Sequence, residues 1–133
     1  MRIATATITA IFLFCGFCSA QALEPYTTAN QYKHQLWNTE DGLPTNTIQA
    51  IQQTADGYLW LGTPAGLVRF DGQSFKTYDK DDLKSSSSDV ICLFVDSEGS
   101  LWIGTNGGGV VQYSDNRFTN VNTAHGLASN VVW

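Results

Sequence analysis

The sequence predicts an all-β fold in which four-stranded antiparallel meanders repeat about every 42 residues, and two observations predict it. First, Gly57–Thr63 (GYLWLGT) returns as Gly99–Thr105 (GSLWIGT), with the tryptophan and both glycines at a constant spacing of 42 residues. Second, short apolar runs alternate with turn signals such as Asp-Gly, which is typical of strands joined by hairpins. A fixed period of this length marks a repeat architecture.

The first 22 residues predict a secretory signal peptide. Arg2 precedes the apolar run Ile3–Phe17, and Ala20-Gln21-Ala22 supplies a small-residue cleavage site. Cleavage near Ala22 places the mature chain in the periplasm or outside the cell. Two of the three cysteines, Cys15 and Cys18, lie in this leader, so their C-x-x-C spacing indicates no redox or metal site.

The remaining composition excludes several function classes. Twelve acidic residues against seven basic ones give a net charge of −5, which opposes nucleic-acid binding. The acidic run Asp79–Asp82 contains its own Lys80 and is interpreted as a solvated loop. His34 and His125 have no partners at metal-ligand spacing, and no nucleophile–base motif occurs. We therefore expect no metal, no cofactor and no catalytic residue.

The chain after the leader divides into an extended segment, a first blade-like unit and a connector. Residues 23–31 lack periodicity, Tyr32–Trp37 is interpreted as a strand, and Thr39–Pro44 is rich in turn formers. Four strands are predicted next, over 47–54, 58–62, 67–70 and 74–78. For the first of these segments, a helix is the alternative. The polar segment Asp79–Ser88, with its serine run, is predicted to be an exposed loop between units.

The second unit repeats this course. Its strands are predicted over 90–95, 101–104, 110–113 and 117–121. One extra residue falls in its glycine turn, Gly107–Gly109, which is a hairpin turn because no Lys-Ser/Thr or helix start follows as in a phosphate loop. A third pair of segments has the same period, because Asp41–Asn46 is similar to His125–Asn130, two periods later. Cys92, in the first strand of this unit, is predicted to pack inside.

Four-stranded meanders at this period are the blades of a β-propeller. We predict a partial propeller over 32–133, with blade one at 46–79, blade two at 88–122 and the start of a third at 130–133. Tryptophans fill the space between blades, and glycines allow tight turns and close approach. The recurring structural residues are Gly57, Trp60, Gly62, Gly99, Trp102 and Gly104.

These units resemble the two-component regulator propeller repeat. The resemblance rests on four stretches: 37–44, 56–63, 66–72 and 98–105. It implies the periplasmic sensor region of a receptor in which blades are followed by an immunoglobulin-like connector, a membrane helix and a histidine kinase or diguanylate cyclase. At a period of 42, the residues from 23 to 133 hold two to three blades, fewer than the four to eight of a closed ring. We therefore expect a fragment without its own output domain.

Three functions follow as hypotheses. The first is a non-enzymatic sensor for an extracellular ligand, with a glycan as the candidate class. This ligand would bind at loops between strands, where Pro64, Ala65, Asn106 and Gly107 are the candidate residues. The second is a sialidase-like propeller enzyme, because Asp96–Trp102 resembles an Asp-box. That aspartate stands one residue too early, and no arginine cluster accompanies it. The third is a secreted scaffold whose missing blades come from other copies.

Overall fold

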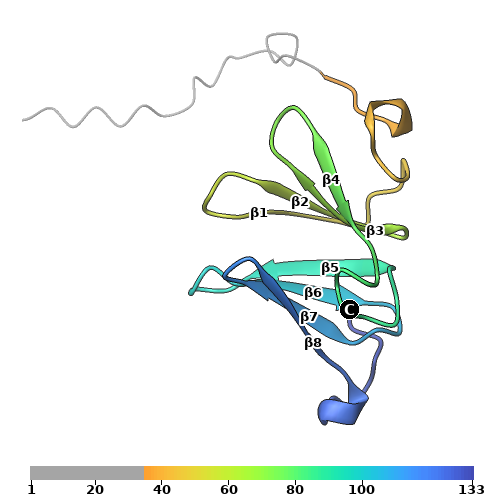
Figure 1. Cartoon of the computed structure of the whole chain (residues 1–133), viewed down its shortest axis with the longest axis vertical. Coiled ribbons are helices and arrows are strands. Elements are labelled where there is room, and N and C mark those ends of the chain that lie inside the picture. Colours follow the sequence, from red (N-terminus) through yellow and green to blue (C-terminus); the bar gives the residue numbers. More distant parts are fainter. Residues whose placement is uncertain (1–34) are drawn as a thin grey trace, which may run out of the picture. The chain divides into compact units, whose positions relative to one another are not determined.

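The structure is a computed structural model that describes residues 35–133, which form one compact unit. This unit contains two four-stranded antiparallel sheets, ordered β1-β2-β3-β4 and β5-β6-β7-β8 (Figure 1). The predicted signal peptide, the segment 23–31 and His34 lie outside the described residues. The strands are β1 (Ala50–Gln53), β2 (Leu59–Thr63), β3 (Gly66–Phe70), β4 (Phe75–Tyr78), β5 (Val90–Val95), β6 (Leu101–Thr105), β7 (Val110–Ser114) and β8 (Arg117–Val121).

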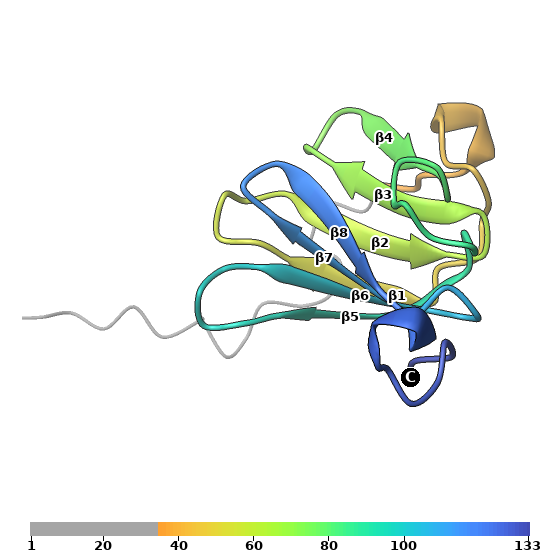
Figure 2. The same cartoon turned by 60° about the horizontal axis from the view of Figure 1, so that its bottom comes forward.

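Each sheet is a meander in which every strand pairs with the next, as a propeller blade requires. We call β1–β4 blade one and β5–β8 blade two. The all-β prediction is confirmed, and the eight predicted strand positions of the two units are all occupied by strands. The inner strands β1 and β5 of the two blades lie side by side (Figures 1 and 2).

The prediction of a strand reaching Trp37 is wrong for the part that the structure describes. Residues 35–38 have no strand, and Trp37 instead packs edge-on against Phe70 and Phe75, with ring centroids 5.1 and 5.5 Å away. The aromatic side chain thus covers the face of blade one that points away from blade two. Its burial depends on this contact and requires no strand pairing.

The main hydrophobic core lies between the two blades. Trp60 lies at the centre of this core and is 1% exposed. Its ring centroid is 5.9 Å from that of Tyr78 and 5.0 Å from that of Tyr113 in blade two. Gly62 lies against Val90, whose Cγ1 would be only 2.9 Å from an added Cβ. A larger residue would push the blades apart. The buried members of this core are Trp60, Leu67, Tyr78, Leu83, Val90, Leu101, Ile103 and Val111.

The connector between the blades is a largely exposed loop, as predicted, except for one leucine. Leu83 is fully buried in the core between the blades. The Asp79 carboxylate accepts hydrogen bonds from the backbone N–H groups of Asp81 and Asp82, and this turn directs Leu83 inward. The hydroxyl of Ser86 donates to the carbonyl of Gly107 at 3.0 Å. Side-chain capping and one leucine therefore order a segment whose composition alone indicates a linker.

Similar capped turns stand before blade one and after blade two. They are the 3-10 turns η2 (Thr39–Asp41) and η3 (Thr123–His125), capped by Asn38 and Asn122. Each is followed by a glycine in the left-handed region, where a side chain would be strained, with φ of 104° at Gly42 and 95° at Gly126. The sequence similarity between Asp41–Asn46 and His125–Asn130 therefore corresponds to a structural element that occurs twice.

A leucine follows each of the two capped turns that precede a blade, and it packs on that blade. Leu43 belongs to a second core cluster with Leu61 and Val68 of blade one. Leu83 lies in the core that contains Ile103 and Val111, their equivalents in blade two. The turn and the blade that follows it consequently share one packed core.

Candidate functional site

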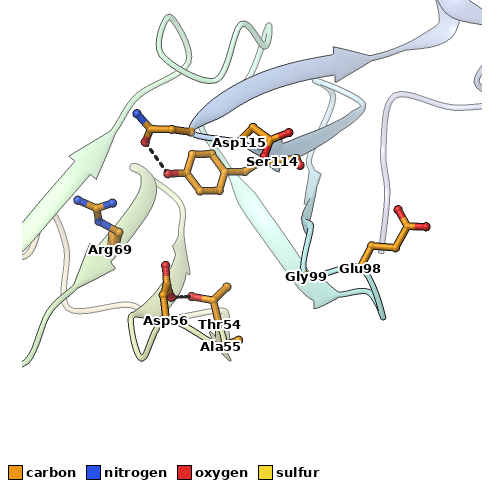
Figure 3. Close-up of a pocket in the computed structure, with 10 residues that line it drawn as sticks. Thr54, Ala55, Asp56, Arg69, Glu98, Gly99, Ser114 and Asp115 are labelled. Carbon is orange, nitrogen blue, oxygen red and sulfur yellow. Dashed lines mark hydrogen bonds between the residues drawn. The ribbon is translucent and has the colours of Figure 1, made fainter.

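A polar hollow opens between the two blades at the end of the molecule that carries the β1–β2, β5–β6 and β7–β8 turns (Figure 3). We call it the inter-blade groove, and its volume is about 480 Å³. Both blades contribute to it, so a ligand held there would contact both. Its lining residues are Thr54, Ala55, Asp56, Arg69, Glu98, Gly99, Tyr113, Ser114, Asp115 and Asn116.

Blade one supplies a positive charge that stacks on an aromatic ring. Arg69 lies in β3 directly opposite Trp60 of β2, and its guanidinium carbon is 4.3 Å from the centre of the Tyr58 ring. Such a cation–π contact fixes the plane of the guanidinium. The N–H groups at its edge remain available to donate hydrogen bonds to other partners. Arg69 is therefore a preorganised hydrogen-bond donor at the groove.

A carboxylate stands in the same wall. Asp56 lies in the β1–β2 turn and accepts a hydrogen bond from the hydroxyl of Thr54. That hydroxyl also accepts from the indole N–H of Trp60 at 3.0 Å. The acidic side chain at the rim is thus tied through Thr54 to the buried tryptophan of the blade.

Blade two supplies a hydroxyl and an amide. Tyr113, near the end of β7, donates its phenolic O–H to Oδ1 of Asn116 at 2.9 Å (Figure 3). Asp115 and Asn116 form the β7–β8 turn with φ of 49° and 61°, a conformation that aspartate and asparagine tolerate better than most residues. This turn places the Asn116 amide beside the hydroxyl of Tyr113.

The charge state of Tyr113 is set by its surroundings. Burial raises the pKa of the phenol above its ordinary value of 10.0, and the neighbouring Tyr78 adds to this rise, while the positive charge of Arg69 opposes it. Tyr113 is therefore neutral at physiological pH and keeps its proton for hydrogen bonding.

The groove combines one guanidinium with the three carboxylates of Asp56, Glu98 and Asp115, and with neutral hydroxyl and amide groups. With three carboxylates and one guanidinium, the lining has a net charge of 1 − 3 = −2 and disfavours an anionic ligand. A neutral, hydroxyl-rich molecule can use donors and acceptors together. Among residues 35–133, no cluster of three or more His, Cys, Asp or Glu side chains could hold a metal ion.

Asp96, the residue behind the Asp-box comparison, is engaged in structural bonds. Its Oδ2 accepts from the indole N–H of Trp102 at 2.7 Å, and its Oδ1 accepts from the backbone N–H groups of Glu98 and Ser100. The bond from Trp102, followed by these backbone bonds, holds the pKa of Asp96 below its ordinary value. Its carboxylate thus anchors the β5–β6 turn, and it is not among the groove's lining residues.

The loop residues predicted to bind a ligand lie at the other end of the blades. Pro64 and Ala65 form the exposed β2–β3 turn, and Asn106 and Gly107 belong to the β6–β7 turn. Consecutive turns of a meander alternate between its two ends, so neither of these turns borders the groove. None of the four residues lines it.

The polar groups of the β6–β7 turn have partners within the protein. The Asn106 side chain donates to Oδ2 of Asp89 at 2.9 Å, while Oδ1 of Asp89 accepts from Gln49 of blade one at 2.7 Å. The backbone N–H of Gly107 donates to the carbonyl of Asn130 at 3.0 Å. Asp89 therefore ties the two blades together at this end.

The groove residues Arg69, Tyr113 and Asn116 were missed by reasoning from sequence. A usable signal existed, because two of them depart from the repeat. Tyr113 stands 43 residues after Phe70, its equivalent in blade one, and Arg69 corresponds to the uncharged Gln112. Polar or charged residues at positions where the other copy is apolar or neutral indicate a role beyond packing.

Comparisons with known proteins agree with this architecture. Residues 42–65 and 84–107 match the model of the family described as two component regulator propeller. A stretch of 47 residues, 35% of the chain, is 43% identical to Histidine kinase P4 of Formosa agariphila and covers 3% of that protein.

A solved structure is similar over most of the chain. The extracellular domain of the hybrid two-component system BT3049 from B. thetaiotaomicron matches 73% of the chain with a TM-score of 0.65 and 28% sequence identity. The chain spans 15% of the length of that structure. Each of the two stretches that match this family's model includes the first two strands of one blade, so the sequence match and the propeller-like fold agree.

Proposed function

We propose that the two blades form part of the extracellular, ligand-sensing propeller of a signalling receptor, and that the inter-blade groove binds the ligand. The observation that carries this proposal is the set of polar groove residues that depart from the repeat, Arg69 and Tyr113 above all. The ring of Tyr113 packs on Trp60, but packing does not require its hydroxyl or the charge of Arg69, because the equivalent positions in the other copy hold Phe70 and Gln112.

The ligand class that this lining favours is a neutral glycan. Sugars present neighbouring hydroxyls that both donate and accept, and a guanidinium, carboxylates, a phenol and an amide match both roles. The groove is large enough for about one or two sugar rings, on the scale of pockets that hold small ligands. A ligand bound to both blades would restrict their relative movement. A receptor could transmit this change in blade mobility as its signal.

The setting of this sensor follows from the same proposal. The leader directs the chain through the inner membrane and is cleaved near Ala22, which leaves the blades in the periplasm. Among residues 35–133, no helix has the length and apolar character to cross a membrane. In the full-length receptor, a membrane anchor and a kinase or cyclase output domain act on the signal, and the propeller itself binds without catalysis.

The test is a binding titration of the chain against a panel of neutral oligosaccharides, followed by calorimetry and amide chemical shifts. We expect Arg69→Gln to weaken binding about tenfold and Tyr113→Phe about threefold to tenfold, the effect of losing one hydrogen bond each. Tyr113→Phe copies Phe70 of blade one, so the fold tolerates it.

Two control variants separate the groove from other surfaces. Gln112→Ala changes the blade-two equivalent of Arg69 and should leave the affinity unchanged. Ala65→Glu alters the exposed β2–β3 turn, which was the site predicted from sequence. Loss of binding in Ala65→Glu with full binding in Arg69→Gln would move the ligand to that turn and reject the groove.

A further inference from the structure

Trp60 is the side chain at which the inter-blade groove meets the hydrophobic core. Its ring packs against that of Tyr113, which also lines the groove. Its indole N–H donates at 3.0 Å to the hydroxyl of Thr54, another lining residue. Because only 1% of Trp60 is exposed, a ligand in the groove would act on this ring through its neighbours.

The hydroxyl of Thr54 has one hydrogen to donate, and two acceptors lie within reach. The carbonyl oxygen of Tyr58 is 3.4 Å away, while Oδ1 of Asp56 is closer and belongs to a carboxylate (Figure 3). The hydrogen therefore goes to Asp56, and the hydroxyl oxygen accepts from Trp60. The three groups form a chain of hydrogen bonds with one direction, from indole through hydroxyl to carboxylate. Bonds in such a chain polarise and strengthen one another.

Asp56 keeps one carboxylate oxygen for the groove. Among residues 35–133, its hydrogen-bond donors are the hydroxyl of Thr54 and, at 3.4 Å, the backbone N–H of Tyr58, and both reach Oδ1. Oδ2 is thus left to accept from a ligand hydroxyl. A donor at Oδ2 draws electron density away from Oδ1, which weakens the bond from Thr54 and, through it, the bond from the indole.

Blade two has the equivalent tryptophan without this chain. Asp96, which stands 42 residues after Thr54, accepts the indole N–H of Trp102 on Oδ2 at 2.7 Å. An ionised carboxylate only accepts, so Asp96 cannot donate onward to Glu98, the repeat equivalent of Asp56. A hydroxyl in place of a carboxylate therefore extends the hydrogen bonds of the blade-one tryptophan into the groove.

We propose that the Thr54 hydroxyl couples the Asp56 carboxylate in the groove to Trp60 in the core, which makes Thr54 a positioning residue for the ligand. This role rests on the proposed function of the groove, whereas the coupling itself can be measured without a ligand. When a ligand hydroxyl donates to Asp56, the indole bond weakens and the ring of Trp60 is held less firmly against Tyr113 of blade two. Occupancy of the groove thereby changes the contact between the blades.

The first experiment measures the coupling by NMR in the full chain without ligand. The indole N–H proton of Trp60 is the signal, and Trp60→Phe assigns it among the four tryptophans. Asp56→Ala is introduced into the unaltered chain and into Thr54→Ser, Thr54→Val and Thr54→Asp. Thr54→Val removes the hydroxyl at nearly constant shape. Thr54→Asp copies Asp96 of blade two, so it keeps an acceptor for the indole and gives the result even where Thr54→Val does not fold.

We expect Asp56→Ala to move the Trp60 proton upfield in the unaltered chain and in Thr54→Ser, because the indole bond weakens in both. In Thr54→Val and Thr54→Asp, the same change should leave the signal in place. Glu98→Ala is the matched control in blade two and should not move the indole signal of Trp102. Equal movement in all four backgrounds, or none in the unaltered chain, would overturn the proposal.

The second experiment measures by calorimetry how the full chain binds four neutral probes, maltohexaose, cellohexaose, xylohexaose and mannohexaose. Thr54→Val should weaken binding about threefold to tenfold, and Thr54→Ser should restore the affinity to within about twofold. Thr54→Val combined with Asp56→Ala should cost no more affinity than Asp56→Ala alone, because the hydroxyl acts through the carboxylate.

The two experiments separate this proposal from the proposed function. A probe that binds the unaltered chain and Thr54→Val equally well would reject the role of Thr54 and leave the groove as the binding site. Failure of all four probes to bind would reject neutral glycan binding, and the positioning role with it. The NMR result would still decide whether the hydroxyl couples Asp56 to Trp60.

Discussion

Blade one and blade two have the same strand order and the same pairing, yet their tryptophans are buried to different extents. Trp60 is 1% exposed, whereas Trp102, at the same position of the repeat, is half-buried. The difference comes from the neighbour, since the rings of Tyr113 and Tyr78 cover Trp60. The comparison teaches that a blade carries half of an interface and that the next blade supplies the other half.

The two blades also fix the same hairpin in different ways. In blade one, the indole N–H of Trp60 donates to the hydroxyl of Thr54 at 3.0 Å. In blade two, Trp102 donates to the carboxylate of Asp96 at 2.7 Å. Hydrogen bonds to an ionised acceptor are shorter and stronger, so blade two compensates in part for its more exposed tryptophan.

The largest expected effect tests the burial of the two tryptophans. Trp60→Ala removes a buried ring and should lower the free energy of unfolding by about 3–5 kcal/mol, as for other large-to-small core changes. Trp102→Ala, at a half-buried position, should lower it by about 1–2 kcal/mol, because less apolar area returns to water. Urea denaturation followed by circular dichroism measures both values. Equal losses would show that burial by a neighbour does not distinguish the blades.

The next effect compares the leucines of the connectors. Leu83→Ala empties a fully buried site and should cost about 2–4 kcal/mol of stability. Leu127→Ala changes the half-buried equivalent and should cost about 1 kcal/mol or less. The same urea titration measures them. If Leu83→Ala is tolerated as well as Leu127→Ala, the connector contributes little to the core of blade two.

The smallest effect is the pH dependence that Asp96 contributes in blade two, beside that of Asp71 in blade one, whose pKa is also lowered, first by the backbone N–H of Ser74. The pKa of Asp96 is lowered in the folded state, so its contribution to stability is present above its ordinary value of 3.8 and is lost as the pH falls through the folded pKa. Asp96→Thr copies Thr54 of blade one and should flatten the fall of the urea midpoint over acid pH. An unchanged acid slope in this variant would assign the dependence to other carboxylates.

The fold was predictable because its signals are local and repeated. The tryptophan spacing and the Asp-Gly turns placed all eight strands of the two blades. The connector is a largely exposed loop between the blades, as predicted, but its ordering by the Asp79 cap and the burial of Leu83 were missed. A single buried leucine in a polar segment carries no periodic signal.

The groove was harder to predict than the fold, because it is made by side chains that meet only after the blades pack. Arg69 of blade one and Tyr113 of blade two are 44 residues apart and belong to different sheets. Each is unremarkable in its own strand. The departure from the repeat at these positions is informative only when the two copies are aligned strand by strand.

The capped turns have a consequence for how such a chain can lengthen or shorten by duplication. Leu43 and Leu83 each pack in the blade that follows their turn. The segment that keeps its own core therefore begins at the cap residue, Asn38 or Asp79, and ends with the last strand of the next blade. A recombination joint before the cap residue moves the leucine together with the blade that it packs in. A joint between the turn and the blade separates the leucine from that blade. Gene rearrangements that preserve the fold should thus have their breakpoints just upstream of the cap residues.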